Sequence, residues 1–285
     1  MKPFKFWSWA TAGAVMMLTV SCTAPTGRLQ MNALRSESLS ANPATYQRLA
    51  IVPIWFTTSA YNYSGLDSHE LAQIANVAGQ KTATCLAAAI TNRGYQVVGE
   101  VRALCGEEDL AALDPETRQL LDAVRVELWW LTQSVRAAGG AGSAELPFRY
   151  RLKAPLLQLQ QKLGVPQADA LVLVDSTVFV ETSTGRRKRL LWNWTGAPPV
   201  TVANQTKALV GGLSDTNALG RRAAVGSPAA IEHTIAIVDP RTQDVLLWTS
   251  VLTPGANVRE AADVRVTVFD LLSALPLIEP AAKKP

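Results

Sequence analysis

The sequence predicts an α/β domain, a layered structure in which a mixed sheet of about five or six strands is flanked by helices. Two observations predict this class. Short apolar runs typical of buried strands alternate with longer stretches in which apolar residues recur at helical spacing. Near the carboxyl end, residues 232–238 and 244–252 read as a hairpin, which adds antiparallel strands to a sheet begun by a strand–helix–strand unit.

The domain is expected to span residues 47–275 and to open with a buried strand at 48–54. Asp67 and Glu70 match a capping box, so a helix should run from there to about residue 92. The later predicted elements are a strand at 95–98, helices within 107–137 with a new start at Asp114-Pro115, a helix at 154–163, a strand from 168 to about 181, a returning strand at 190–194 and a last helix at about 258–275.

Residues 1–21 read as a bacterial secretory signal peptide. Lys2 and Lys5 give it a basic start, residues 6–20 carry no charge, and Ser21 is the small residue that a signal peptidase needs. The uncharged run is about 15 residues, short of the roughly 20 that span a bilayer. The sequence therefore predicts export, and the alternatives to a lipoprotein signal are an ordinary signal cleaved elsewhere or an uncleaved anchor.

Cys22 ends this signal, and the Ser21-Cys22 pair resembles the lipobox of bacterial lipoproteins. The resemblance implies that the Cys22 thiol receives a diacylglyceryl group and that its new amine is acylated, for example with palmitate. Two or three such chains hold a protein stably on a membrane. Thr23 follows where lipoproteins retained in the inner membrane usually carry Asp, which favours the outer membrane, with the domain facing the periplasm.

The mature chain reads as one globular domain with short flexible ends. Hydrophobic residues make up 48% and charged residues 18% of the sequence, which suits a packed core. Residues 22–46, after the signal, are predicted to be the lipidated cysteine and a flexible tether, and 276–285 a disordered tail. The formal charge of +4 falls to about +2 when Lys2 and Lys5 leave, too little to indicate nucleic acid as a partner.

The two remaining cysteines, Cys85 and Cys105, are candidates for a disulfide, because the periplasm is oxidising and an even pair is left once Cys22 is lipidated. The alternative is two buried thiols, since free cysteine is among the most buried residue types. Two cysteines and the distant His69 and His233 show no ligand spacing, so no metal and no other cofactor is expected.

Three segments resemble a small α/β domain found in periplasmic and outer-membrane assembly lipoproteins. They are the strand 48–54, the helix end and strand at 164–174, and the hairpin containing 237–242 and 247–250. The group includes the curli secretion channel lipoprotein, a lipoprotein activator of penicillin-binding proteins and the N-terminal domain of the Tol translocation protein. Its domains are mostly binding and scaffold modules without catalytic residues, so the resemblance transfers no site.

The chain departs from that group in three places. Gln243 stands where the hairpin usually has Gly, residues 107–153 form a long helical insertion, and residues 197–230 form a second one. No pair of segments shows the ten-residue alternation of a membrane barrel strand, so pore formation is not expected.

No catalytic residue is assigned. The sequence contains no nucleophile elbow, no His-Glu-x-x-His and no phosphate loop. His69 could act as a general base in the first turn of its helix, but an exposed or capping role is the simpler interpretation. His233 is interpreted as a polar residue at a strand edge. The chain is therefore expected not to be an enzyme.

Two surface features are candidates for contact with a partner. The run Arg186, Arg187, Lys188 and Arg189 could meet an anionic surface or an acidic partner, while a solvated hairpin tip is the alternative. Trp192 and Trp194 share one strand face by their period-two spacing and form a candidate aromatic contact surface, with core packing as the alternative.

These features predict a non-enzymatic lipoprotein that scaffolds or regulates an envelope assembly, secretion or wall-synthesis complex. Its expected partners are the membrane, through the lipid, and an envelope protein, with a second copy of the chain as an alternative partner. The second hypothesis is a periplasmic lipoprotein that binds a small ligand or glycan through the loop after Ile54 and the Trp192/Trp194 face.

Overall fold

A computed structural model describes residues 29–61, 66–137, 150–180, 201–203, 230–254, 258–259 and 261–278. Within these residues, nine strand segments join in one mixed sheet, ordered β1-β9-β8-β6-β2-β4, with β3 pairing β5, β6 and β7. The segments are β1 (Leu29–Arg35), β2 (Arg48–Ile51), β3 (Ile54–Tyr61), β4 (Gln96–Val98), β5 (Ala103–Leu104), β6 (Ala170–Val180), β7 (Thr201–Ala203), β8 (Ala230–Val238) and β9 (Val245–Pro254). The predicted α/β class is confirmed.

The nine segments fill six strand positions across the sheet, because two of these positions are occupied by interrupted strands. Segments β2 and β3 both run parallel to β6, with Ile51 opposite Val172 and Trp55 opposite Asp175. Four residues on β2–β3 therefore match three on β6, which is the count of a β-bulge. Pro53 lies in this bulge, where its missing N–H costs no ladder hydrogen bond. Segments β4 and β5 repeat the interruption on the neighbouring edge, beside β2 and β3 respectively.

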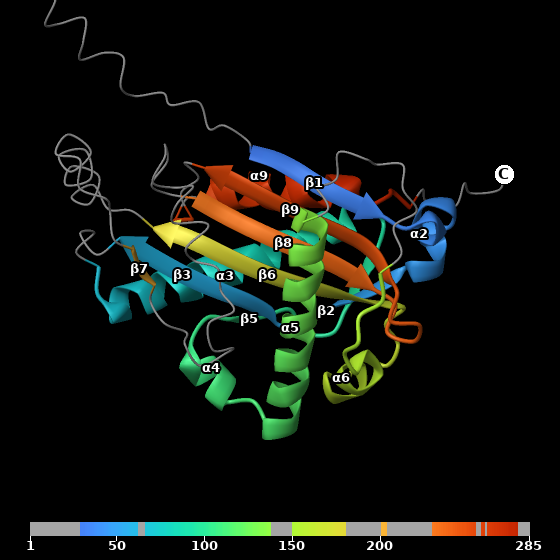
Figure 1. The fold of residues 1–285 in the computed structure, drawn as a ribbon, viewed down its shortest axis with the longest axis horizontal. Helices are drawn as coiled ribbons and strands as arrows, with labels where there is room; N and C mark the ends of the chain where they lie inside the picture. The colour runs from blue at the N-terminus through green and yellow to red at the C-terminus, as the bar shows by residue number, and fades with distance from the viewer. Residues whose placement is uncertain are drawn as a thin grey trace, which may run out of the picture.

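Helices cover both faces of the sheet, so the domain has three layers (Figure 1). Helices α3 (Ser68–Thr91) and α9 (Ala261–Leu271) lie behind the sheet in this view, and α5 (Pro115–Ala137) crosses its front. The described residues form two buried apolar clusters, one on the α3 side and one on the α5 side. Helix α5 is fixed to the sheet where the Trp248 indole on β9 donates to the Thr132 hydroxyl at 3.3 Å.

The predicted tether at 22–46 is wrong for residues 29–46, which belong to the fold. Strand β1 pairs antiparallel with β9 at the sheet edge, and α2 (Glu37–Ala41) and a 3-10 helix, η1 (Pro43–Tyr46), follow it. Ser36 caps α2 by accepting from the Leu39 amide, and the Leu39 side chain is fully buried. Strand β1 is stabilised by its pairing with β9, some 200 residues further along the chain, and not by its local sequence pattern.

The predicted tail at 276–285 is wrong for its first residues. After the short 3-10 helix η3 (Leu272–Ala274), the chain runs along the end of α3, and the Ile278 amide donates to the Arg93 carbonyl at 2.9 Å. Gly94 has a φ of 87°, and a Cβ there would lie 2.5 Å from the Ile278 carbonyl oxygen. A residue without a side chain is therefore needed where the tail docks. Residues 279–285 lie outside the described residues.

Of the two predicted insertions, only the first is largely described. It forms α4 (Glu107–Ala111) and α5, and α5 is the longest helix of the layer on its face of the sheet. The predicted new helix start at Asp114-Pro115 is confirmed, since the Asp114 carboxylate accepts from the Thr117 amide at 2.9 Å. From the second insertion the structure describes β7, which pairs with the end of β3, Ser59 opposite Ala203.

Candidate functional site

Several residues singled out in the sequence lie outside the described residues. These are Cys22, the basic run Arg186, Arg187, Lys188 and Arg189, and the aromatic pair Trp192 and Trp194. Their proposed roles therefore stay predictions. Among the described helices, none combines the length and apolarity that a membrane span requires.

Cys85 and Cys105 form no disulfide, and both thiols are free. The Cys105 sulfur packs against Gly79 of α3, where a Cβ would approach it to 2.4 Å. Cys85 is six residues further along α3, which places it about 120° around the helix and about 9 Å along the axis. Cys105 is buried, and desolvation raises the pKa of its thiol to about 12. Cys85 is only half-buried, so the alternative of two buried thiols holds for Cys105 alone.

The two histidines lie in different environments. His69 is exposed in the first turn of α3, where its Nε2 lies 2.9 Å from the Gln73 side-chain amide nitrogen. His233 lies in the middle of β8 and is 1% exposed, so its interpretation as a strand-edge residue is wrong. Its Nδ1 is 2.8 Å from the Ser176 hydroxyl of β6. Both side chains point into the core on the α3 side, so this serine–histidine pair has no access to a substrate.

A pocket of about 270 Å³ lies where the strands β2–β3 and β4–β5 are interrupted. Its lining combines charged residues with buried apolar ones, and the apolar part is called the floor below. The residues that line it are Ile51, Pro53, Glu100, Arg102, Ala112, Leu113, Asp114, Thr117, Lys162, Leu163 and Val165. Within the described residues, no group of three or more His, Cys, Asp or Glu side chains is placed to hold a metal ion, here or elsewhere.

Three elements from distant parts of the sequence close this pocket. The strand interruptions supply one wall, the turn between α4 and α5 the second, and the end of α6 (Leu156–Lys162) the third. Gly99, with a φ of 84°, brings the β4–β5 connection against the segment that follows α6, because a Cβ at this position would lie 2.5 Å from the Val165 side chain. Gly164, with a φ of 67°, ends α6.

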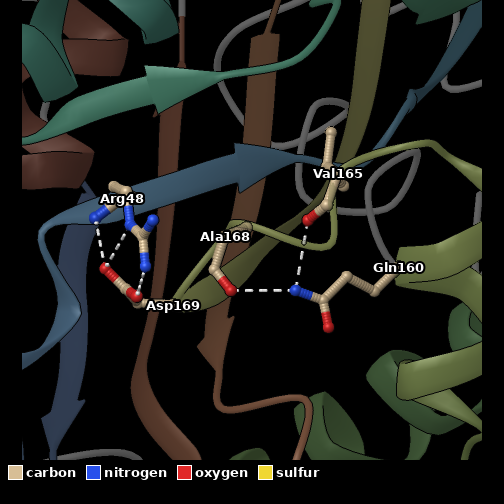
Figure 2. A network of polar contacts seen from close by, with 5 residues as sticks. All are labelled: Arg48, Gln160, Val165, Ala168 and Asp169. Atoms are coloured by element: carbon tan, nitrogen blue, oxygen red, sulfur yellow. Dashed lines mark hydrogen bonds and ion pairs between the residues drawn. The ribbon is translucent and has the colours of Figure 1, made fainter.

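A polar network holds the wall formed by α6. Figure 2 shows the buried Gln160 side-chain amide, which donates to the carbonyls of Val165 and Ala168 at 3.2 and 2.8 Å. The next residue, Asp169, accepts from the backbone and the guanidinium of Arg48 at the start of β2, at 2.8–3.3 Å. The network fixes the chain between α6 and β6, and with it the position of Val165 in the pocket.

The charged groups of the pocket differ in whether they have partners. The Thr117 hydroxyl and amide hydrogen-bond to Asp114 and lower the pKa of its carboxyl. Lys162 forms an ion pair with Glu116, at 2.5 Å, which raises the pKa of its ammonium group. Glu100 and the half-buried Arg102 form no ion pair or side-chain hydrogen bond with any described residue. The pocket therefore offers one free anion and one free cation.

Sequence reasoning missed this pocket. Its local signals are Pro53 directly after a buried strand, and Gly99 between two short extended segments. Neither signal shows that the two interruptions lie side by side, or that residues 112–117 and 162–165 meet over them.

A scan of known protein families and a search of curated proteins find no match to the chain. Among solved structures, the chain is similar to the PelC dodecamer from Paraburkholderia phytofirmans, with 8% identity and a TM-score of 0.32, over 87% of this chain and 99% of that chain. A point variant of the same dodecamer gives 9% identity and a TM-score of 0.31, with the same coverage.

Proposed function

We propose that this protein is a non-enzymatic lipoprotein of the bacterial cell envelope, attached through Cys22 to the outer membrane. In this proposal it acts as a scaffold or regulator of an assembly, secretion or wall-synthesis complex, through contact with an envelope protein. The lipobox-like Ser21-Cys22 pair and the strand and hairpin segments that resemble assembly lipoproteins support the proposal.

The position of β1 is the observation that carries it. Strand β1 is the edge of the sheet and starts at Leu29, seven residues after Cys22. Seven residues span at most about 25 Å when fully extended, whereas a tether to residue 46 would have allowed about 90 Å. A lipid on Cys22 would thus keep one edge of the domain close to the membrane surface. Close attachment at a fixed edge suits a module that presents a particular face to a partner.

The test compares three forms of the full chain in cells: the natural chain, Cys22→Ser, and a chain with about 20 Gly/Ser residues inserted after Gly27. The insertion keeps the lipidation signal but removes the close attachment. A matched control carries the same insertion after Ile278. Each form is labelled with a palmitate analogue, fractionated, and crosslinked in intact cells before mass spectrometry.

We expect the natural chain and the control to take up the label and to crosslink to one envelope protein or to a second copy of the chain. Cys22→Ser should lose the label and the crosslink, and the insertion after Gly27 should keep the label but lose the crosslink. A soluble Cys22→Ser form with the same crosslinks would contradict the proposal. So would turnover of a wall or glycan substrate that His69→Gln abolishes.

A second candidate, a lipoprotein that binds a small ligand, is favoured by one observation. The pocket at the strand interruptions combines an apolar floor with unpaired charges of both signs.

A further inference from the structure

The pocket at the strand interruptions presents its two free charges from the short connection between β4 and β5. Glu100 and Arg102 flank Val101, which packs against the core on the α3 side. Glu100 and Arg102, unlike Val101, both line the pocket. The backbone here is fixed, since the Arg102 carbonyl accepts from the Ile54 amide at 3.0 Å.

The Arg102 guanidinium is the group that most needs a ligand. It is half-buried, and no described residue supplies an anion to it. A guanidinium binds a carboxylate through two parallel hydrogen bonds, which makes it the preferred side chain for planar anions. Lys162 cannot substitute for it, because Glu116 already neutralises the Lys162 ammonium group.

The other charges restrict what such an anion can be. A ligand that is only anionic would meet the carboxylates of Glu100 and Asp114, and a ligand that is only cationic would meet Arg102 and Lys162. Like charges in such a site are destabilising. A molecule that carries one carboxylate and one ammonium group pairs with Arg102 and Glu100 together.

The volume of the pocket and its apolar residues indicate the same class of ligand. The volume of about 270 Å³ is near the lower end of ligand pockets, which hold about 300–1,000 Å³. Leu113 and Val165 are buried side chains that line the pocket and would receive an apolar group. We propose that this pocket binds a free amino acid or dipeptide as a zwitterion, with Arg102 holding the carboxylate, Glu100 the ammonium group and the apolar floor the side chain. The site is independent of the lipid attachment and of any protein partner.

The test is calorimetric titration of the full chain in detergent with L-leucine and L-alanyl-L-alanine. N-acetyl-L-leucine amide has the same apolar group without charges and serves as the probe control. Arg102→Gln and Glu100→Gln remove one free charge each, and Ala112→Trp fills the exposed mouth of the pocket. Arg241→Gln is the matched control, since Arg241 is an exposed arginine of the β8–β9 turn outside the pocket. Thermal unfolding of each variant checks that it folds.

We expect at least one zwitterion to bind and the uncharged probe not to bind. Arg102→Gln should weaken binding by about tenfold or more, and Glu100→Gln by several-fold. Ala112→Trp should abolish binding, and Arg241→Gln should leave it within about twofold. The proposal is overturned if neither zwitterion binds at about 10 mM, if the uncharged probe binds equally well, or if folded Arg102→Gln and Glu100→Gln bind like Arg241→Gln.

Discussion

His233 on β8 and Ser176 on β6 face each other across two adjacent strands, with 2.8 Å between the imidazole Nδ1 and the hydroxyl oxygen. Both side chains lie in the core under α3 and α9, and the His233 Nε2 has no hydrogen-bond partner among the described residues. Burial lowers the pKa of His233 to about 4, because the charged imidazolium would lose its hydration. The pair is therefore a neutral element of the core.

Acid should destabilise the protein through this histidine. In the unfolded chain His233 has its ordinary pKa of about 6.5, so between pH 6.5 and 4 the unfolded state binds the proton and the folded state does not. The contribution of His233 to stability is complete above pH 6.5 and falls as the pH drops, by up to about 3 kcal/mol near pH 4. Urea unfolding at several pH values measures it.

His233→Asn is the control for this prediction, since its amide can keep a hydrogen bond to Ser176 but does not titrate. The natural chain should exceed His233→Asn in free energy of unfolding by less and less as the pH falls from 6.5 to 4. Parallel curves over this window would show that His233 is not the titrating group.

Gly79 on α3 should be required for the contact between this helix and β5. A Cβ at residue 79 would lie 2.4 Å from the Cys105 sulfur and 2.9 Å from the Ala103 Cβ. Gly79→Ala should therefore destabilise the fold by about 1–3 kcal/mol, although alanine favours a helix by about 1 kcal/mol. In a Cys105→Ala background the sulfur is gone, so the same substitution should cost less. An equal cost in both backgrounds, measured by urea unfolding, would contradict this account.

The free thiols give a redox prediction. Because Cys85 and Cys105 are not bonded, a reducing agent should leave the thermal unfolding midpoint unchanged. The half-buried Cys85 should react with a thiol reagent before the buried Cys105, whose raised pKa leaves little thiolate. Mass spectrometry after timed alkylation separates the two sites. A midpoint that falls on reduction, together with unreactive cysteines, would instead indicate a disulfide.

Gln160 should be important for both stability and the pocket. Its amide is buried and donates to two carbonyls that precede β6. Gln160→Leu keeps the packing but removes this donor from the Ala168 carbonyl, while the Val165 carbonyl still accepts from the Ala168 amide at 3.0 Å, so the cost should be about 1–3 kcal/mol. Arg48→Gln, at the exposed end of the same network, should cost much less, because solvent screens the ion pair with Asp169. Equal losses for the two variants in urea unfolding would show that burial does not set the cost.

Local patterns were enough to predict much of the fold. The capping box at the start of α3 is present with both of its hydrogen bonds, from the Glu70 amide to Asp67 and from the Asp67 amide to Glu70. The hairpin of β8 and β9 is also confirmed, since the two strands pair antiparallel from Ala230 opposite Pro254 to Val238 opposite Val245. In these elements the residues that decide the structure are close together in the sequence.

Elements that depend on distant contacts were not predictable. Helix α9 carries apolar side chains on more than one face: Val266 and Phe269 are 43% and 41% exposed, while Val264 and Val268 are buried. Packing of α9 against α3 decides which face is covered, and both faces carry apolar residues. The pocket needed three segments that lie far apart in the chain, so no local pattern could reveal it.

Gln243 occupies the hairpin position that is usually glycine, and it adopts a φ of 64°. Its side-chain amide donates to the Ala154 carbonyl at 3.1 Å, which offsets part of the cost of this conformation. Gln243→Gly should be nearly neutral, because it loses that hydrogen bond but removes about 1 kcal/mol of backbone strain. Gln243→Ala loses the hydrogen bond and keeps the strain, so it should be about 1 kcal/mol less stable than the glycine variant. Urea unfolding of the three proteins tests this order, and an alanine variant as stable as the glycine variant would show that the positive φ costs nothing here.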